Sequence, residues 1–218
     1  MTLALAWSGG KDSALTLAAL REGGEEPCAL MTTVTETYDR VSMHGVRREL
    51  LARQAEAAGV PLVEVTIPPE CVNAEYERRM AAALAEPPLD AAGEVAFGDL
   101  FLEDVRAYRE TRLAAAGRRA RFPLWGRDTS ELARGFLAAG FEAVVACVDP
   151  RQLDPSFAGR HYDAALLADL PEGVDPCGEN GEFHTFVVAG PVLRGRIECE
   201  PGERVERDGF VFCDLIPA

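Results

Sequence analysis

The sequence predicts an α/β protein in which a parallel β-sheet carries helices on both faces, followed by a smaller α+β domain. Two observations predict this class. Through the first part of the chain, short apolar runs typical of buried strands alternate with segments of helical periodicity. After Gly126 the alternation ends, and the chain finishes in short strands separated by turn residues. We therefore expect one domain at residues 1–127 and a second at residues 128–218.

The elements of the first domain follow in a regular order. The expected strands are residues 3–7, 28–34, 62–67, 95–98 and 121–125. The expected helices, one after each of the first four strands, are residues 12–22, 46–58, 74–85 and 102–116. Because strand–helix–strand units join parallel strands, all five strands are expected in one sheet, whose order a single sequence does not give.

The second domain opens with a helix signal. Asp128 and Glu131 have the spacing of a capping box and precede a helix at residues 132–138. Strands are expected at residues 142–148 and 183–189. The terminal hairpin is expected to combine residues 192–199 and 204–215, around Pro201-Gly202 and Asp208-Gly209. Its open strand edges lead us to expect a homodimer.

Composition and charge narrow the classes of function. The 218 residues are 48% apolar, which is enough for a sizeable core. The net charge of −14 disfavours general nucleic-acid binding, because that binding relies on Lys and Arg to neutralise phosphates. The chain has no run of eighteen apolar residues and no cleavable signal pattern, so we expect a cytoplasmic protein without membrane contact. The six cysteines lack metal-ligand spacing, and of these Cys177 is the candidate for a reactive thiol.

The strongest chemical motif follows the first strand: Ser-Gly-Gly-Lys-Asp-Ser at residues 8–13. Its glycines let backbone N–H groups approach a phosphate, while the helix start and Lys11 supply positive charge. The run is not a Walker loop, which would need a glycine at position 5 and a hydroxyl residue at position 12. It resembles the PP-loop of N-type ATP pyrophosphatases, with an adenine nucleotide alpha hydrolase-like fold, which bind ATP and transfer AMP to a substrate oxygen.

This resemblance implies which residues bind ATP and what each of them does. Lys11 is expected to neutralise charge on the departing pyrophosphate. Asp12 has two interpretations, a ligand of Mg²⁺ through water or a cap of the helix. The residues expected to bind ATP around the loop are Ala6, Trp7, Ser8, Gly9, Gly10, Lys11, Asp12 and Ser13.

Further segments narrow the resemblance to one family. These are Phe-Gly-Asp-Leu-Phe at residues 97–101, Pro-Leu-Trp-Gly at 123–126, Met43-His44 and the octapeptide Gly-Glu-Asn-Gly-Glu-Phe-His-Thr at 178–185. Together they resemble the diphthine–ammonia ligase family, over nearly the whole chain as far as about residue 188. Members adenylate the carboxylate of diphthine, a modified histidine on elongation factor 2, and ammonia then displaces AMP to form the amide.

The resemblance also implies roles for single residues. Met43 is expected against the adenine, and Lys11, Asp12, Glu182 and His184 are expected to be catalytic. An imidazole such as that of His184 could accept a proton from attacking ammonium. The residues expected around the acceptor are His44, Asp99, Glu179, Asn180, Glu182, His184 and Thr185.

Some of these residues have a second interpretation from the sequence alone. His44 is equally consistent with a helix-entry role, and Asp99 with a helix N-cap. Asn180 and residues 175–177 resemble bacterial members of the family. Because bacteria do not make diphthamide, such a member would adenylate a different, small acceptor, for example in cobalamin salvage.

Two other functions remain open. Sulfur transfer to tRNA, another chemistry of PP-loop proteins, would need a nucleophilic cysteine and a basic surface. A sensor would bind ATP or AMP without turnover, since a fold does not by itself imply a reaction. Release of pyrophosphate distinguishes a ligase from a sensor.

Overall fold

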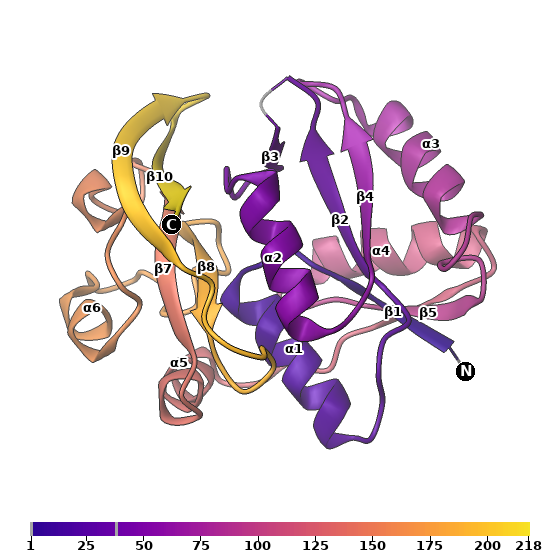
Figure 1. The fold of residues 1–218 in the computed structure, drawn as a ribbon, viewed down its shortest axis with the longest axis horizontal. Coiled ribbons are helices and arrows are strands. Elements are labelled where there is room, and N and C mark those ends of the chain that lie inside the picture. Colours follow the sequence, from indigo (N-terminus) through magenta and orange to yellow (C-terminus); the bar gives the residue numbers. More distant parts are fainter. Residues whose placement is uncertain (1, 38) are drawn as a thin grey trace.

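The computed structural model describes residues 2–37 and 39–218 and contains two β-sheets with helices between and around them (Figure 1). The strands of the first sheet are β1 (Thr2–Ala6), β2 (Leu30–Thr35), β3 (Arg40–Val41), β4 (Leu62–Ile67), β5 (Ala92–Ala96) and β6 (Arg119–Arg121). The helices that accompany it are α1 (Lys11–Glu22), α2 (Arg48–Ala58), α3 (Asn73–Leu84) and α4 (Glu103–Ala115).

The first sheet is parallel in the order β4-β2-β1-β5-β6, with the short β3 added antiparallel to β2. On one edge of β2, β4 pairs along its whole length. On the other edge β1 pairs only as far as Met31, and β3 takes over at Val34 and Thr35. The chain that follows β3 therefore lies close to the loop that follows β1.

Helices cover both faces of this sheet, as predicted. Successive side chains of a strand point to opposite faces. Leu3 and Leu5 of β1 belong to a core built with α1 and α2, whereas Ala4 belongs to a separate core built with α3 and α4. Helices α1 and α2 lie between the two sheets in Figure 1, so this face also meets the second domain.

The elements of the second domain are α5 (Thr129–Ala138), β7 (Glu142–Val148), the 3₁₀ turn η1 (Pro155–Phe157), α6 (Ala164–Asp169), β8 (Phe183–Ala189), β9 (Cys199–Arg207) and β10 (Phe210–Pro217). Its sheet is antiparallel, in the order β8-β7-β10-β9. Phe186 and Val187 of β8 share the core of α1 and α2. The Asp128 carboxylate accepts a hydrogen bond from the Glu131 N–H at 2.8 Å, which confirms the predicted cap of α5.

The four predicted helices of the first domain are confirmed to within two residues at each end. Two strand predictions there were displaced. The strand expected at residues 95–98 is β5, which begins earlier and ends at Ala96. The strand expected at residues 121–125 is β6, which ends at Arg121. Pro123, which has no N–H for a strand ladder, stands instead in a turn in which the Trp125 N–H donates to the carbonyl of Phe122.

The terminal hairpin was predicted only in part. Residues 192–198 are not a strand, and β9 begins at Cys199. Pro201-Gly202 lies within β9 rather than in a turn, whereas Asp208-Gly209 makes the turn to β10 as predicted. As an edge strand, β9 can contain Pro201 without losing a ladder bond. A Cβ at Gly202 would lie 2.8 Å from the carbonyl oxygen of Asp214 in the neighbouring strand, so this position favours glycine.

None of the helices in the described part of the chain is long and apolar enough to cross a membrane.

Strand β10 holds the turn that follows β3. Gly45 in this turn has a φ of +67°, and a Cβ there would lie 2.3 Å from Cδ1 of Phe212. Asp214 of β10 forms ion pairs with Arg40 at 2.8 Å and with Arg47 at 2.6 Å, on the two sides of the turn. The second domain thus fixes the segment that contains Met43 and His44.

This packing predicts that Gly45→Ala destabilises the protein more than an alanine at a comparable open position. Gly117 has a φ of +69° and no atom within 4 Å of a Cβ, so Gly117→Ala adds only backbone strain of about 1 kcal/mol. Gly45→Ala adds a steric clash with Phe212, which should lower the free energy of unfolding by about 1–3 kcal/mol more. Urea unfolding of both variants measures the difference, and equal losses of stability would contradict the packing.

Candidate active site

The loop between β1 and α1 contains two glycines at which a Cβ would lie very close to neighbouring atoms. A Cβ at Gly9 would lie 2.9 Å from Oε1 of Gln54, and Gly9 has a φ of +79°. A Cβ at Gly10 would lie 3.0 Å from the carbonyl oxygen of Thr185. The N-terminal N–H groups of a helix have no partners within it, so the start of α1 behind this loop can bind an anion.

Gln54 of α2 stabilises this loop through hydrogen bonds. It is fully buried, and its Nε2 donates to the carbonyls of Gly9 at 3.0 Å and Val187 at 2.7 Å. Its Oε1 accepts from the indole N–H of Trp7 at 2.8 Å. Gln54 therefore ties the loop to β8 of the second domain. The sequence analysis missed this residue, and its only signal is a glutamine among the apolar positions of the helix.

The end of the octapeptide binds directly to the loop. The N–H of Lys11 donates to Oγ1 of Thr185 at 3.0 Å, and the N–H of Val187 donates to the carbonyl of Gly9 at 2.9 Å. The carbonyl of Thr185 lies 3.2 Å from Nδ1 of His44. Strand β8 thus brings the second domain against the loop and against the turn after β3.

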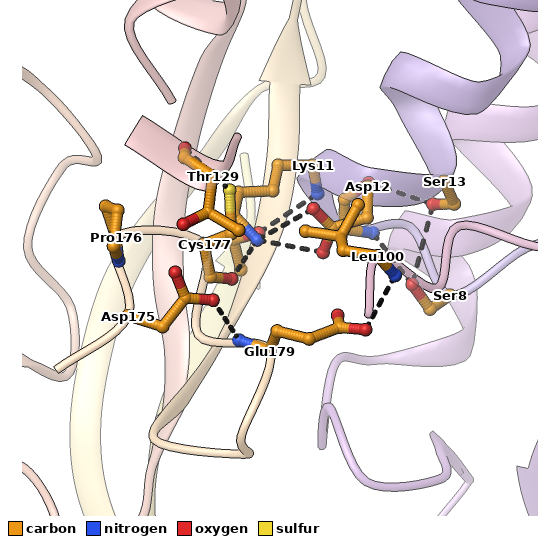
Figure 2. Close-up of polar contacts among 12 residues, drawn as sticks. Ser8, Lys11, Asp12, Ser13, Leu100, Thr129, Asp175, Pro176, Cys177 and Glu179 are labelled. Carbon is orange, nitrogen blue, oxygen red and sulfur yellow. Dashed lines mark hydrogen bonds and ion pairs between the residues drawn. The ribbon is translucent and has the colours of Figure 1, made fainter. Parts of the chain in front are cut away.

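Lys11 is buried and charged. Its Nζ donates to both carboxylate oxygens of Asp12, at 2.8 and 2.9 Å, and to the carbonyl of Cys177 (Figure 2). Burial opposes the charge, but the Asp12 carboxylate outweighs it and raises the pKa of Lys11 above its ordinary value. Asp12 does not cap α1, whose N-cap is Gly10, so the capping interpretation of Asp12 was wrong.

Cys177 lacks the features of a reactive thiol. It is buried, and its Sγ donates to the carbonyl of Thr129 at 3.3 Å. Burial raises the pKa of the thiol to about 12, so it stays protonated near neutral pH. Sulfur transfer through Cys177 therefore has no support in the structure.

Two histidines lie together at the cavity. The ring centroids of His44 and His184 are 4.6 Å apart. Burial lowers the pKa of His44 to about 3 and that of His184 to about 4, so both rings are neutral near neutral pH. Helix α2 begins at Arg48, beyond His44, so His44 does not have the helix-entry role.

Glu179 links the octapeptide to the first domain. Its Oε1 accepts from the N–H of Leu100 at 2.7 Å, across the gap between the domains in Figure 2. Burial raises the pKa of Glu179 to about 7. At neutral pH this carboxyl group exists in both protonation states, which is the property of an efficient proton acceptor or donor.

Glu182 and Asn180 do not line the cavity. Glu182 is buried, and its Oε1 accepts from the N–H of Asp175 at 2.9 Å and from Nδ2 of Asn180 at 3.0 Å. Asp175 in turn accepts from the N–H of Glu179 at 2.9 Å. Glu182 and Asn180 instead stabilise the turn that presents Glu179, and their expected contact with the acceptor stays a prediction.

Asp99 is not a helix cap. The N-cap of α4 is Leu102, which makes no side-chain cap bond. Asp99 instead pairs with Arg109 of α4, with Oδ2 2.7 Å from Nε and Oδ1 accepting from Nη2 at 3.1 Å. The guanidinium of Arg109 also lies 4.3 Å from the centre of the Phe97 ring. The sequence analysis did not identify Arg109, because its spacing in α4 resembles that of any surface arginine.

These groups surround one cavity of about 360 Å³. Met43, with a φ of +67° and 63% exposed, lies in its wall beside His44. Gly9, although part of the loop, does not line the cavity. The predicted residues that line the cavity are Ala6, Trp7, Ser8, Gly10, Lys11, Asp12, Ser13, Met43, His44, Asp99, Glu179, His184 and Thr185.

Family models match almost the whole chain. One described as the diphthamide synthase N-terminal domain matches residues 1–119, and one described as the diphthamide synthase C-terminal domain matches residues 128–215.

Curated relatives carry the name diphthine–ammonia ligase. The Schizosaccharomyces pombe protein is 25% identical over 95% of this chain, which spans only 38% of that protein's length. The Danio rerio protein is 25% identical over 95% of this chain and 90% of its own length. The Homo sapiens protein is 23% identical over 99% of this chain and 89% of its own length.

Among solved structures, a predicted subunit of tRNA methyltransferase from Methanocaldococcus jannaschii aligns with 90% of this chain and 100% of its own. The TM-score of this alignment is 0.44 and the sequence identity is 18%.

The position of Gln54 predicts a large loss of stability on its removal. Gln54→Leu would leave the indole N–H of Trp7 and the carbonyl of Val187 buried without these partners, at a cost of about 2–4 kcal/mol. Arg53→Leu, at the exposed neighbouring position of the same helix, is expected to change stability by less than about 0.5 kcal/mol. Urea unfolding compares them, and similar losses would refute the assigned role of Gln54.

The raised pKa of Glu179 predicts a pH-dependent stability. Because its folded-state pKa of about 7 exceeds the ordinary 4.5, the stability it contributes is complete below the unfolded pKa and is lost as pH rises through 7. Glu179→Gln keeps the acceptor for Leu100 but does not titrate. The melting temperature of this variant relative to wild type should therefore rise between about pH 5 and pH 8. A constant difference would contradict the raised pKa.

Proposed function

The chain belongs to the diphthamide synthase family, and from this premise we propose that it is an ATP-dependent ligase that adenylates a substrate carboxylate and converts it to an amide with ammonia. The observation that carries the proposal is the contact between Thr185 and Lys11. Through it, the octapeptide of the second domain and the anion-binding loop of the first share one cavity. A ligase needs its acceptor and its nucleotide in such a common space.

In the first step, a carboxylate oxygen of the acceptor attacks the α-phosphorus of ATP. The bond from that phosphorus to the bridging oxygen breaks, and pyrophosphate leaves with the electron pair. The glycine loop, the start of α1 and the charged Lys11 are the groups suited to stabilise the negative charge that develops on pyrophosphate.

A magnesium ion fits the loop through Asp12. Among the described residues no three His, Cys, Asp or Glu side chains converge as a metal site. Magnesium commonly uses one or two carboxylates together with substrate phosphates, so Asp12 alone is an adequate protein ligand. When bound, the ion would neutralise phosphate charge. Asp12 would then exchange part of its present pairing with Lys11.

In the second step, the nitrogen of ammonia attacks the acyl carbon, and AMP leaves with the electrons of the broken C–O bond. The attacking nitrogen must release a proton. Glu179, with a pKa of about 7, can accept and hold it better than His184, whose pKa is about 4. We therefore assign proton transfer to Glu179 and a neutral hydrogen-bonding role to His184.

The acceptor is proposed from the family. Its curated relatives are named for diphthine and ammonia, so diphthine on elongation factor 2 is the first acceptor to test. A small carboxylate is the second, for a bacterial-type member. Both use the same adenylation chemistry.

The test measures AMP formed from α-³²P-ATP with magnesium and ammonium, in the presence of elongation factor 2 bearing diphthine or of small carboxylates. Lys11→Ala is expected to slow AMP formation by about 10²–10³-fold, since it removes charge stabilisation from the leaving group. Arg106→Ala changes a half-buried side chain on α4 that does not line the cavity, so it should leave the rate unchanged.

The outcomes separate the candidate functions. AMP formed with the modified factor supports diphthine as acceptor, and AMP formed only with a small acid supports adenylation of a different acceptor. If ATP binds firmly and no acceptor yields AMP, the ligase proposal fails in favour of a nucleotide sensor.

A further inference from the structure

The two edges of the second sheet differ in what covers them. At the edge formed by β8, the N–H of Val187 donates to the carbonyl of Gly9, and the N–H of Ile197 donates to the carbonyl of Val188. At the edge formed by β9, no strand of the described part of the chain pairs with the side turned away from β10. Such an edge presents backbone N–H and C=O groups to which a further strand can bond.

The register of the terminal hairpin shows which residues present these groups. Arg207 forms the pair with β10 that closes the two-residue turn at 208–209, in which both residues have a positive φ. Because hydrogen-bonded and non-bonded pairs alternate along an antiparallel ladder, Arg207 and Val205 bond to β10. The N–H and C=O groups of Arg204 and Glu206 then point to the open edge.

The part of this edge that suits a further strand is residues 203–207. Before it, Pro201 has no N–H to donate, and the register of β9 with β10 shifts close to Gly202. Within it, the side chains of residues 203–206 are exposed, and Val205 is 41% exposed. These residues therefore form a short strand edge that is open to solvent.

The side chains of this stretch are complementary to a second copy of themselves. Their order is Glu-Arg-Val-Glu-Arg. When two copies pair antiparallel about Val205, Arg204 faces the partner's Glu206, and Glu203 faces the partner's Arg207. Opposite charges directly across an antiparallel pair are stabilising, whereas like charges are destabilising. The order of charges thus favours pairing of the strand with itself.

The backbone favours the same register. Arg204 and the partner's Glu206 can exchange backbone hydrogen bonds, since both present these groups at the edge. Val205 then faces the partner's Val205 in a non-bonded pair, in which opposite side chains lie closest. A single register therefore satisfies the backbone groups, the charges and the exposed apolar residue.

The contacts of Arg204 leave its charge available. Its Nε donates to the carbonyl of Ala158 at 2.9 Å, and its Nη2 donates to the carbonyl of Ser156 at 3.0 Å. Carbonyl groups carry no net charge, so these bonds position the guanidinium without neutralising it.

We propose that the edge of β9 is a homodimer interface, in which residues 203–207 of two copies pair antiparallel about Val205. The second sheets of the two copies, with four strands each, then form one continuous sheet. The paired stretch is short and each copy has a net charge of −14, so the dimer should be reversible, with a Kd on the order of 10 µM. This inference goes beyond the proposed function and does not depend on it.

The test reverses single charges and measures dimerisation by sedimentation equilibrium, at protein concentrations on both sides of the expected Kd. In Arg204→Glu an acidic residue faces the partner's Glu206, and in Glu206→Arg a basic residue faces the partner's Arg204. Each variant alone should dimerise at least about tenfold more weakly than the wild type, because two attractive pairs become two repulsive ones. Glu200→Arg, an exposed position of β9 outside the paired stretch, changes the net charge as Glu206→Arg does and should dimerise like the wild type.

Mixing the two weakened variants distinguishes a lost interface from a folding defect. In an equimolar mixture of Arg204→Glu and Glu206→Arg, the acidic pair of one chain faces the basic pair of the other. This mixture should form a heterodimer about as tightly as the wild type dimerises. The double variant Arg204→Glu/Glu206→Arg should also dimerise like the wild type, because each chain again carries both charges.

A disulfide test reports the register. The Cα atoms of a non-bonded antiparallel pair are about 4.5 Å apart, within the range that a disulfide spans. Val205→Cys should therefore form a covalent dimer under mild oxidation. In Glu203→Cys the two thiols would be about 13 Å apart along the strands, too far for a disulfide. Neither this variant nor the wild type, with its six cysteines, should form the covalent dimer.

Three results would overturn the inference. The first is a wild type that stays monomeric at every concentration tested, which would leave the edge to a different partner. The second is a pair of charge-reversal variants that dimerise like the wild type, or whose mixture does not recover dimerisation. The third is a covalent dimer of Glu203→Cys that forms as readily as that of Val205→Cys. Because none of these measurements uses nucleotide, a missing AMP product would reject the ligase alone, and a missing dimer would reject the interface alone.

Discussion

The contact between β8 and the glycine loop is the interaction on which the site depends. The loop has no side chains of its own at Gly9 and Gly10, and the space where they would stand is filled by Gln54 and by the backbone of Thr185. The conformation of such a loop is fixed by the residues that pack against it, because its glycines have no side chains with which to fix it. Since one of these neighbours belongs to the second domain, the anion-binding geometry requires both domains.

Burial at this contact also sets the charge of each group in the cavity. Lys11 keeps its charge because the Asp12 carboxylate accompanies it into the interior. The histidines have no such partner, so burial makes both of them neutral. Glu179 lies between these two cases. Burial raises its pKa to about 7, while the hydrogen bond from the N–H of Leu100 partly replaces the water that its carboxylate loses. The same dry environment thus gives one permanent cation, two neutral rings and one carboxyl group that titrates near neutral pH.

The sequence predicted what depends on local chemistry. Helix periodicity located the four helices of the first domain, and a continuous apolar run and a capping pair located β7 and α5. It also predicted the loop, whose glycines and lysine lie within six consecutive residues. It could not identify Gln54, because its partner Val187 lies far along the chain. It could not identify Arg109, because its partner Asp99 lies outside α4 and does not share the periodicity of that helix. The turn predicted at Pro201-Gly202 was wrong for the same reason, since a sequence does not show which strand will lie at an edge and can contain a proline.

The octapeptide illustrates the limit of a motif as a guide to function. Its residues were expected to act together on the acceptor, but the structure gives them two tasks. Glu182 reaches back to the N–H of Asp175, and Asp175 binds the N–H of Glu179, so this chain of contacts fixes the turn. Glu179 is then free to face the cavity. Glu182 and Glu179 thus have different roles within one motif, and only the direction of the side chain distinguishes the glutamate that shapes the turn from the one that faces the cavity.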